Sequence, residues 1–420
     1  MKILFLNTYD NRGGAAVAAW RIYNSLAGKC ETQFGTLLDE NIEKPVIKAF
    51  PTRINKFVWL FNLSLEKLFF LPSEKSKKER FAFSTASTGI RPQNILKKWC
   101  PDIIHIHWFN QGFFSLNGFS KLIKANKPIV WTLHDMWAFT GGCHYSGSCH
   151  RYRENCGNCP LLHKPSGKDL SYRQLSKKRK IYNTSAVTFV TCSNWLREQA
   201  VTSNLLSDKR IEVIPNPIDT NIFCVNDKTL AREKLGLNQH KKYLLFTAGN
   251  VADPRKGLNY LLRALNKIHT DSPELADNLV LLLAGKNTTA IEKNIPVETK
   301  YLGYLTTREQ LVQVYNAADL FLLPSLEDNL PNTIMEALSC GTPCIAFKTG
   351  GIPEMIEHLS TGYLAEYKSD TDLANGILWA FQQDMNKLSV NARKFAVENY
   401  SEEVVGNKYY KLYQSVISKE

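Results

Sequence analysis

The chain has 420 residues, of which 44% are apolar and 22% charged, so its composition excludes a disordered chain and favours two globular domains of about 200 residues each. The net charge of +13 is uneven, because residues 1–200 hold 29 Lys and Arg against 13 Asp and Glu, whereas residues 201–420 hold 23 against 26. A nucleic acid, an anionic membrane surface, a phosphate-bearing substrate or plain solvation could each explain the basic half. No nucleic-acid-binding signature accompanies its basic clusters, so we expect no nucleic-acid partner.

The first apolar run, Lys2–Leu6, indicates a buried strand rather than a secretion signal, because Asp10 and Arg12 follow it closely. We therefore expect a cytoplasmic protein. The next segment contains Gly13 and Gly14, which would let the backbone approach a ligand where a helix starts. A tight turn explains the same residues. The pattern is not G-x-G-x-x-G, so a nicotinamide cofactor is not expected.

A second feature of the first half is the run Phe57–Leu71, which is rich in large apolar and aromatic residues. Lys75–Arg80 follows it with four cations. This order fits a helix that lies in a membrane interface, and it fits a buried helix pair equally well. No apolar run is long enough and sufficiently free of charges to predict a membrane-spanning helix.

Short runs rich in Val, Ile and Leu alternate with helix-length segments along the chain, as in βαβ units with parallel sheets. A polar, Lys-rich stretch divides these runs into two sets, which predicts two Rossmann-like, doubly wound domains. We expect a first domain at 1–220, a linker at 221–242, a second domain at 243–400 and a final helix at 401–420 that packs on either domain. The expected strands are Lys2–Leu6, Ile103–His107, Ile129–Leu133, Val187–Cys192, Ile211–Ile214, Tyr243–Ala248, Leu279–Ala284, Tyr301–Gly303, Leu320–Leu323 and Pro343–Phe347.

Candidate functional residues follow several of these strands, where ligands bind in doubly wound sheets. His134 and Asp135 come directly after Ile129–Leu133. Arg255 and Lys256 follow the first strand of the second domain, just before a helix. Two cations at a helix start are electrostatically unfavourable unless an anion lies there, and a diphosphate would supply it. A solvent-facing basic turn is the simpler explanation.

The most informative segment is 324–347, which places Asp328 and Glu336 eight residues apart across a turn. Pro331 excludes a helix before it, so Thr333 is expected to cap a short helix that Gly341 ends. Glu336 would then lie in the first turn, where free N–H groups favour hydroxyl and phosphate ligands. The same spacing also fits a capping box, in which Glu336 bonds only to the backbone.

Four of the ten cysteines cluster at Cys143, Cys149, Cys156 and Cys159. A reducing compartment disfavours disulfides, and four thiolates could close a structural zinc site. Free thiols are an equal alternative.

Taken together, these motifs resemble the family-4 glycosyltransferases, which have the two-domain GT-B fold, and the resemblance covers nearly the whole chain. It rests on Arg12–Ala16, Asp102–Trp108, Thr132–Trp137, Ile214–Asp219, Lys256-Gly257, the Asp328 and Glu336 element with the EALSCGTP run around it, and Gly350–Ile356. The run after Thr132 and the cysteines resemble a subgroup that builds bacterial surface polysaccharides, such as colanic acid, O-antigen or capsule.

The resemblance implies a retaining hexosyltransferase that uses a nucleotide-diphosphate sugar and needs no cofactor for catalysis. Glu336 would bind the ribose, while Asp328, Asn329 and Leu330 would hold the donor sugar. Arg255 and Lys256 would neutralise the diphosphate. Gly13 and Gly14 would approach the donor phosphates or the acceptor, and His134 would face the reacting sugar.

Two departures from the family pattern concern Asp328, where the family usually has Glu, and Asn250, where it often has Arg. The shorter Asp328 retracts the carboxylate by about one methylene, which affects fine positioning. We take Arg255 as the substitute for the missing arginine.

We therefore expect a cytoplasmic enzyme, peripheral at the inner membrane face, that transfers sugar to a lipid-diphosphate-linked acceptor. The basic first domain would bind the acceptor and face the anionic membrane surface. The alternatives are a GT-B sugar-nucleotide epimerase and a non-catalytic carbohydrate- or membrane-binding protein on the same fold.

Overall fold

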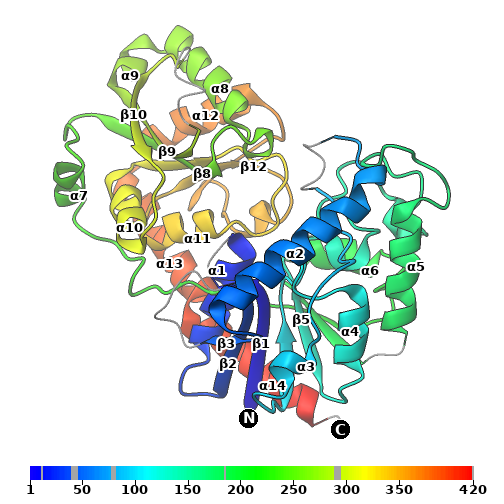
Figure 1. Ribbon diagram of the computed structural model, residues 1–420. Helices are drawn as coiled ribbons and strands as arrows, with labels where there is room; N and C mark the ends of the chain where they lie inside the picture. Colours follow the sequence, from blue (N-terminus) through cyan, green and yellow to red (C-terminus); the bar gives the residue numbers. More distant parts are fainter. Residues whose placement is uncertain (11–12, 39–45, 77–81, 184–185, 288–294, 419–420) are drawn as a thin grey trace. The chain divides into compact units, whose positions relative to one another are not determined.

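The computed structural model describes residues 1–10, 13–38, 46–76, 82–183, 186–287 and 295–418. They form two units, each built on its own parallel sheet (Figure 1). Unit 1 comprises Met1–Pro217 with Val405–Glu420, and unit 2 comprises Ile218–Val404.

The seven-stranded sheet of unit 1 has the order β3-β2-β1-β4-β5-β6-β7, and all its pairs are parallel. Its strands are β1 (Lys2–Tyr9), β2 (Glu31–Leu38), β3 (Val46–Lys48), β4 (Ile103–Ile106), β5 (Ile129–Leu133), β6 (Val187–Thr191) and β7 (Ile211–Val213).

Alternate residues of these strands enter two different cores, because successive side chains of a strand point to opposite faces. Leu4 and Leu6 of β1 pack into one core, whereas Ile3 and Phe5 pack into the other. Both faces are covered, so the strands read as continuous apolar runs. The covering helices are α1 (Gly14–Ser25), α2 (Thr52–Phe70), α3 (Gln93–Leu96), α4 (Leu116–Ile123), α5 (Leu170–Tyr182), α6 (Asn194–Val201) and α14 (Glu402–Ile417), with short 3₁₀ helices η1 (Leu71–Ser73), η3 (Trp137–Phe139) and η4 (Arg151–Arg153).

The last helix, α14, completes one of these two cores. Tyr409 and Tyr413 are fully buried and lie in the same apolar cluster as Phe5 of β1. Their hydroxyls bond to Thr132 and to the buried His105. The chain end therefore belongs to unit 1.

The six-stranded sheet of unit 2 has the order β10-β9-β8-β11-β12-β13 and is also parallel throughout. Helices α8 and α12 lie side by side over one face (Figure 1). The strands are β8 (Lys242–Asn250), β9 (Leu279–Lys286), β10 (Glu298–Gly303), β11 (Leu320–Leu323), β12 (Cys344–Phe347) and β13 (Gly362–Ala365). The helices are α7 (Lys228–Lys234), α8 (Leu258–Asp271), α9 (Pro273–Asn278), α10 (Arg308–Ala317), α11 (Asn332–Ser339), α12 (Asp370–Phe381) and α13 (Met385–Tyr400), with η5 (Pro254–Lys256) and η7 (Ile352–Glu354).

The predicted fold class, two doubly wound parallel-sheet domains, is confirmed. The three strands that the sequence analysis missed are β2, β3 and β13. Strand β2 contains Gly35, where an added Cβ would lie 2.8 Å from the side chain of Leu6. A glycine that packs this closely interrupts the apolar run by which a buried strand is predicted. Strands β3 and β13 span only three and four residues.

The stretch 221–242, expected to be a linker, contains helix α7 and belongs to unit 2. Arg232 of α7 is buried and donates two hydrogen bonds to the carboxylate of Asp319. This bidentate pair ties the helix to the start of β11.

Candidate functional site

The strand order of unit 2 places β8 beside β11, although two strands separate them in the chain. Such a reversal of strand order is the point where ligands bind in open α/β sheets. The loop after β8 carries Lys256, and the loop after β11 carries Asp328. Their side chains form an ion pair across this point, with 2.7 Å between Nζ of Lys256 and Oδ2 of Asp328.

Two glycines bring the backbone close to the loop after β11. Gly257 has a φ of +71°, and a Cβ there would lie 1.8 Å from the carbonyl oxygen of Pro324. Gly350, with a φ of +55°, would place its Cβ 1.7 Å from the carbonyl oxygen of Asp328. Neither site tolerates a side chain, so the glycines hold both flanking loops against the loop that carries Asp328.

Arg255 lies beside Lys256, but its guanidinium is paired with Asp253, with Nη2 2.7 Å from Oδ2. Burial would raise the pKa of Asp253, but the hydrogen bonds from Arg255 lower it. The two cations of this turn thus already have carboxylate partners. The expectation that these cations need a bound anion such as a diphosphate is wrong for the structure without donor, because Asp253 and Asp328 supply the negative charge.

The next two predicted sugar-binding residues, Asn329 and Leu330, are buried in the same loop. Asp328 itself accepts a second hydrogen bond from Ser325, at 3.3 Å. The predicted donor-binding residues Lys256, Asp328, Asn329 and Leu330 are therefore gathered at one point of the sheet.

Glu336 is also buried, but its local structure differs from the prediction. Helix α11 starts at Asn332 after Pro331, which has no side-chain cap, so the cap at Thr333 is wrong. Glu336 lies beyond the first turn, and its Oε2 accepts a hydrogen bond from the hydroxyl of Tyr315 at 3.0 Å. The sequence could not show this contact, because Tyr315 comes from helix α10.

In unit 1, Gly13 precedes helix α1 with a φ of +88°, and a Cβ on it would meet nothing within 4 Å. Its carbonyl oxygen accepts hydrogen bonds from the amides of Ala16 and Val17. Gly14 is the first residue of the helix. Arg12, which belongs to the same motif, lies outside the described residues.

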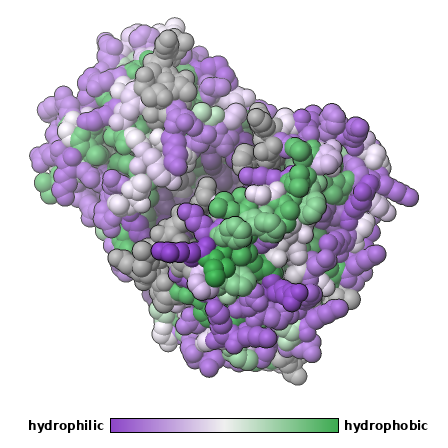
Figure 2. Space-filling view, in the orientation of Figure 1, coloured by the Kyte–Doolittle hydropathy of each residue, from purple (hydrophilic) through white to green (hydrophobic). Residues whose placement is uncertain are grey.

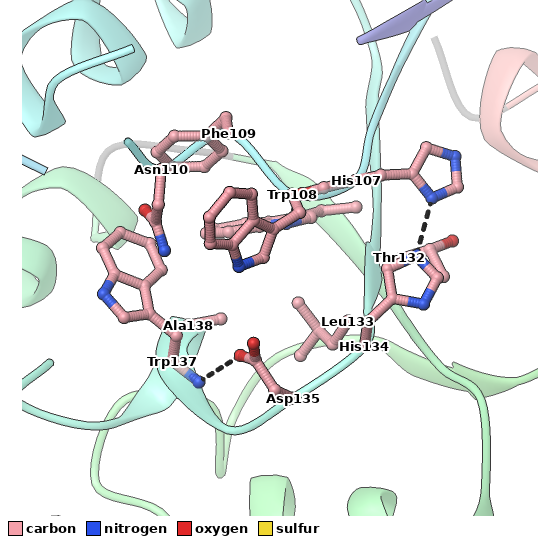
Figure 3. A pocket seen from close by; sticks show the side chains of 11 residues that line it. His107, Trp108, Phe109, Asn110, Thr132, Leu133, His134, Asp135, Trp137 and Ala138 are labelled. Carbon is pink, nitrogen blue, oxygen red and sulfur yellow. Dashed lines mark hydrogen bonds between the residues drawn. The ribbon is translucent and has the colours of Figure 1, made fainter. Parts of the chain in front are cut away.

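His134 follows β5 and lines a pocket with residues that follow β4 (Figure 3). Its Nε2 lies 3.0 Å from Nδ1 of His107, toward which it points in Figure 3. Burial lowers the pKa of His134 to about 4, despite the nearby carboxylate of Asp135. His134 is therefore neutral at physiological pH. One of its ring nitrogens then donates a hydrogen bond and the other accepts one.

The same pocket edge contains a chain of polar groups that links Asp135 to two residues the sequence analysis did not single out, His144 and Ser84. Oδ2 of Asp135 lies 2.7 Å from Nδ1 of His144, whose Nε2 lies 2.9 Å from Oγ of Ser84. Burial would raise the pKa of Asp135, but the charge and hydrogen bond of His144 lower it. This chain fixes the loop that carries His134.

The four clustered cysteines all line one small, mainly apolar pocket together with Phe83 and Tyr152. None of the four forms a disulfide within the described residues, and burial raises the pKa of Cys143 to about 12. Within the described residues, no group of three or more His, Cys, Asp or Glu side chains is arranged to hold a metal ion. The geometry thus gives the zinc hypothesis no support, and zinc at Cys143, Cys149, Cys156 and Cys159 stays a prediction for metal analysis.

Comparison with known proteins finds glycosyltransferase families in both halves of the chain. Residues 63–222 match the model of glycosyltransferase family 4, and residues 227–396 match that of the glycosyl transferases group 1. Most of the chain is thus similar to glycosyltransferase domains. The second match contains Lys256, Asp328 and Glu336.

The curated relatives match only in part. N-acetyl-alpha-D-glucosaminyl L-malate synthase of Bacillus anthracis is 27% identical over 50% of this chain and 55% of its own length. The putative colanic acid biosynthesis glycosyl transferase WcaC of Escherichia coli is 26% identical over 61% of this chain and 60% of its own. The chain thus spans less than two thirds of the length of these two relatives.

Solved structures match over the full length and show the GT-B fold. Sucrose-phosphate synthase from Thermosynechococcus elongatus has a TM-score of 0.69 at 17% identity, with both chains fully covered. HepE of Anabaena, solved with UDP-glucose, has a TM-score of 0.62 at 19% identity and covers 99% of this chain and 100% of its own.

Proposed function

We propose that this chain transfers a sugar from a nucleotide-diphosphate sugar to a lipid-diphosphate-linked acceptor, with retention, during surface polysaccharide assembly. One observation carries the proposal: the Lys256–Asp328 pair spans the strand-order reversal of a group 1 glycosyltransferase domain. HepE is solved with UDP-glucose and WcaC is a putative colanic acid biosynthesis glycosyl transferase, which supports the donor class and the pathway class.

In this proposal the donor diphosphate replaces Asp328 as the partner of Lys256. The donor diphosphate competes with Asp328 for the ammonium group of Lys256, because both partners are oxyanions. Asp328 is then released to accept hydrogen bonds from the hydroxyls of the donor sugar. The buried Glu336 accepts hydrogen bonds from the ribose beside the one from Tyr315.

The transfer step breaks the bond from the anomeric carbon to the diphosphate and forms a bond to the acceptor oxygen on the same face. The acceptor proton passes to the departing diphosphate. Lys256 and Arg255 stabilise the negative charge that develops on it, so the chemistry as proposed needs no metal. The contact of His134 with the sugar stays a prediction, because Nε2 of His134 is already bonded to His107.

The acceptor and the site of action are proposed from charge. The basic first half suits an acceptor that carries a lipid diphosphate at the inner, anionic membrane face. No described helix is both long and apolar enough to cross a membrane.

The test is a donor screen with the purified chain, a panel of nucleotide sugars, and lipid extract from the source cell. We expect one donor to release nucleoside diphosphate and label a lipid product, and proton NMR of that product to show the donor's anomeric configuration. Lys256→Met should lose the activity, whereas Lys394→Met, which removes an exposed, carboxylate-paired lysine of α13, should keep it. Donor turnover to an isomer without transfer would indicate the epimerase, and no turnover at all would contradict an enzymatic role.

A further inference from the structure

Helix α2 of unit 1 exposes an unusual amount of apolar surface. Seven of the fifteen large apolar side chains that are exposed among the described residues lie between positions 54 and 71, and Phe57 alone is 69% exposed. Figure 2 shows them as a continuous apolar band along the helix. The seven are Ile54, Phe57, Leu60, Phe61, Leu68, Phe69 and Leu71.

The opposite face of α2 is already anchored, so the helix cannot roll to bury this band. Buried Glu66 accepts hydrogen bonds from the hydroxyl of Thr85 and the amide of Ala86. Buried Asn62 donates to the carbonyl oxygen of Gly112. Val58 and Trp59 pack against the main core of unit 1. Breaking these buried hydrogen bonds would cost more free energy than the helix could gain by rolling to bury its apolar band.

The charged side chains of α2 also differ between its exposed and buried faces. Arg53, Lys56 and Lys67 are exposed on or beside the apolar band, whereas Glu66, the one acidic residue in the helix sequence, is turned inward. An apolar helix face on which the exposed charges of the helix are all cations is complementary to a surface with an apolar interior and anionic headgroups. A second copy of the same face would bring like charges together.

We propose that α2 docks this chain on an anionic phospholipid bilayer, lying flat in the headgroup layer. Its 19 residues span about 28 Å at the rise of an α-helix. Phe57, Phe61 and Leu68 would enter the boundary with the acyl chains, while the cations contact the headgroups. The biological role of docking, which is to bring unit 1 to a lipid-linked acceptor, rests on the proposed function. The cations at 77, 78 and 80 lie outside the described residues.

The test is co-sedimentation of the purified chain with vesicles, either of phosphatidylcholine alone or with 30% phosphatidylglycerol. We expect binding to the anionic vesicles that falls as salt is raised, and little binding to the neutral ones. Phe57→Ser with Phe61→Ser should lower the partition coefficient at least tenfold. Val390→Ser, at a site 66% exposed on α13 of unit 2, should leave it unchanged. Lys56→Glu should lower it roughly fivefold or more, whereas Lys408→Glu on α14 should have a smaller effect.

The control for folding and function is donor binding without vesicles, which the α2 variants should retain because the changed residues are exposed and lie outside unit 2. Equal binding by the wild type and the Phe57, Phe61 variant would overturn docking, as would a dimer that the same variant dissolves without any vesicle binding. Loss of vesicle binding with intact donor turnover would leave the proposed function standing. Vesicle binding without donor turnover would contradict the proposed function and leave docking standing.

Discussion

Nζ of Lys256 lies 2.7 Å from Oδ2 of Asp328, although 72 residues separate the two in the chain. The two side chains are partly exposed, so their pairing contributes only about 1 kcal/mol or less to stability. We therefore expect Lys256→Met to fold normally and to lose a charge-assisted hydrogen bond to the donor, which weakens binding roughly 10- to 100-fold. Isothermal titration with the nucleotide sugar and a thermal melt measure both effects. An unchanged affinity would remove Lys256 from the donor site.

Asp328→Asn keeps the size of the side chain and removes its charge, so it tests the proposed exchange of partners. Without the competing carboxylate, Lys256 should bind free nucleoside diphosphate as well as or better than the wild type does. Transfer should still fall at least tenfold, because the sugar hydroxyls lose an ionised acceptor. A parallel loss of diphosphate affinity and transfer would contradict the exchange.

Two conservative variants separate the contributions of Glu336 and Tyr315 to nucleotide binding. Glu336→Gln keeps a hydrogen-bonding group at the same place and should fold, yet lower nucleotide affinity about tenfold by loss of the charge. Tyr315→Phe keeps the carboxyl group of Glu336 and should change affinity less than fivefold. Equilibrium binding of the free nucleotide is the measurement. Equal effects of the two variants would assign Glu336 a structural role only.

The glycine contacts predict a contrast between two alanine variants. Gly350→Ala forces a side chain into positive φ and against the carbonyl of Asp328, so it should destabilise unit 2 by about 2 kcal/mol or more and weaken donor binding. Gly249→Ala, where an added Cβ meets nothing within 4 Å, should be nearly neutral. Thermal melts with and without donor compare the two, and a neutral Gly350→Ala would show that this loop adjusts freely.

The pKa of His134, lowered by burial to about 4, predicts a pH dependence of stability. Between about pH 6.5 and pH 4 the unfolded chain binds a proton at this residue that the folded chain does not, so stability falls as pH falls through this window. His134→Gln should reduce the slope by up to about 1.4 kcal/mol per pH unit. Thermal melts from pH 4 to pH 8 measure it. Identical slopes would mean that His134 is protonated in the folded chain as well.

Much of the fold could be predicted because its signal is local. Strands β5 and β11 end where the sequence analysis placed them, since buried strands of parallel sheets are uninterrupted apolar runs. Phe57–Leu71 fitted a helix in a membrane interface and a buried helix pair equally well, and local pattern could not show which side chains are exposed. Their exposure depends on how buried Glu66 and Asn62 anchor the helix, and the partners of these two residues lie about 20 and 50 residues away.

The class of fold, the loops that carry candidate residues and the resemblance to glycosyltransferases follow from local patterns in the chain. Which of those residues meet depends on tertiary packing. Lys256 pairs with Asp328 because the sheet places β8 beside β11. Glu336 accepts a hydrogen bond from Tyr315 of helix α10, and Arg255 pairs with Asp253. Strand order and side-chain direction are set by packing between segments far apart in the chain, and no local pattern encodes such contacts.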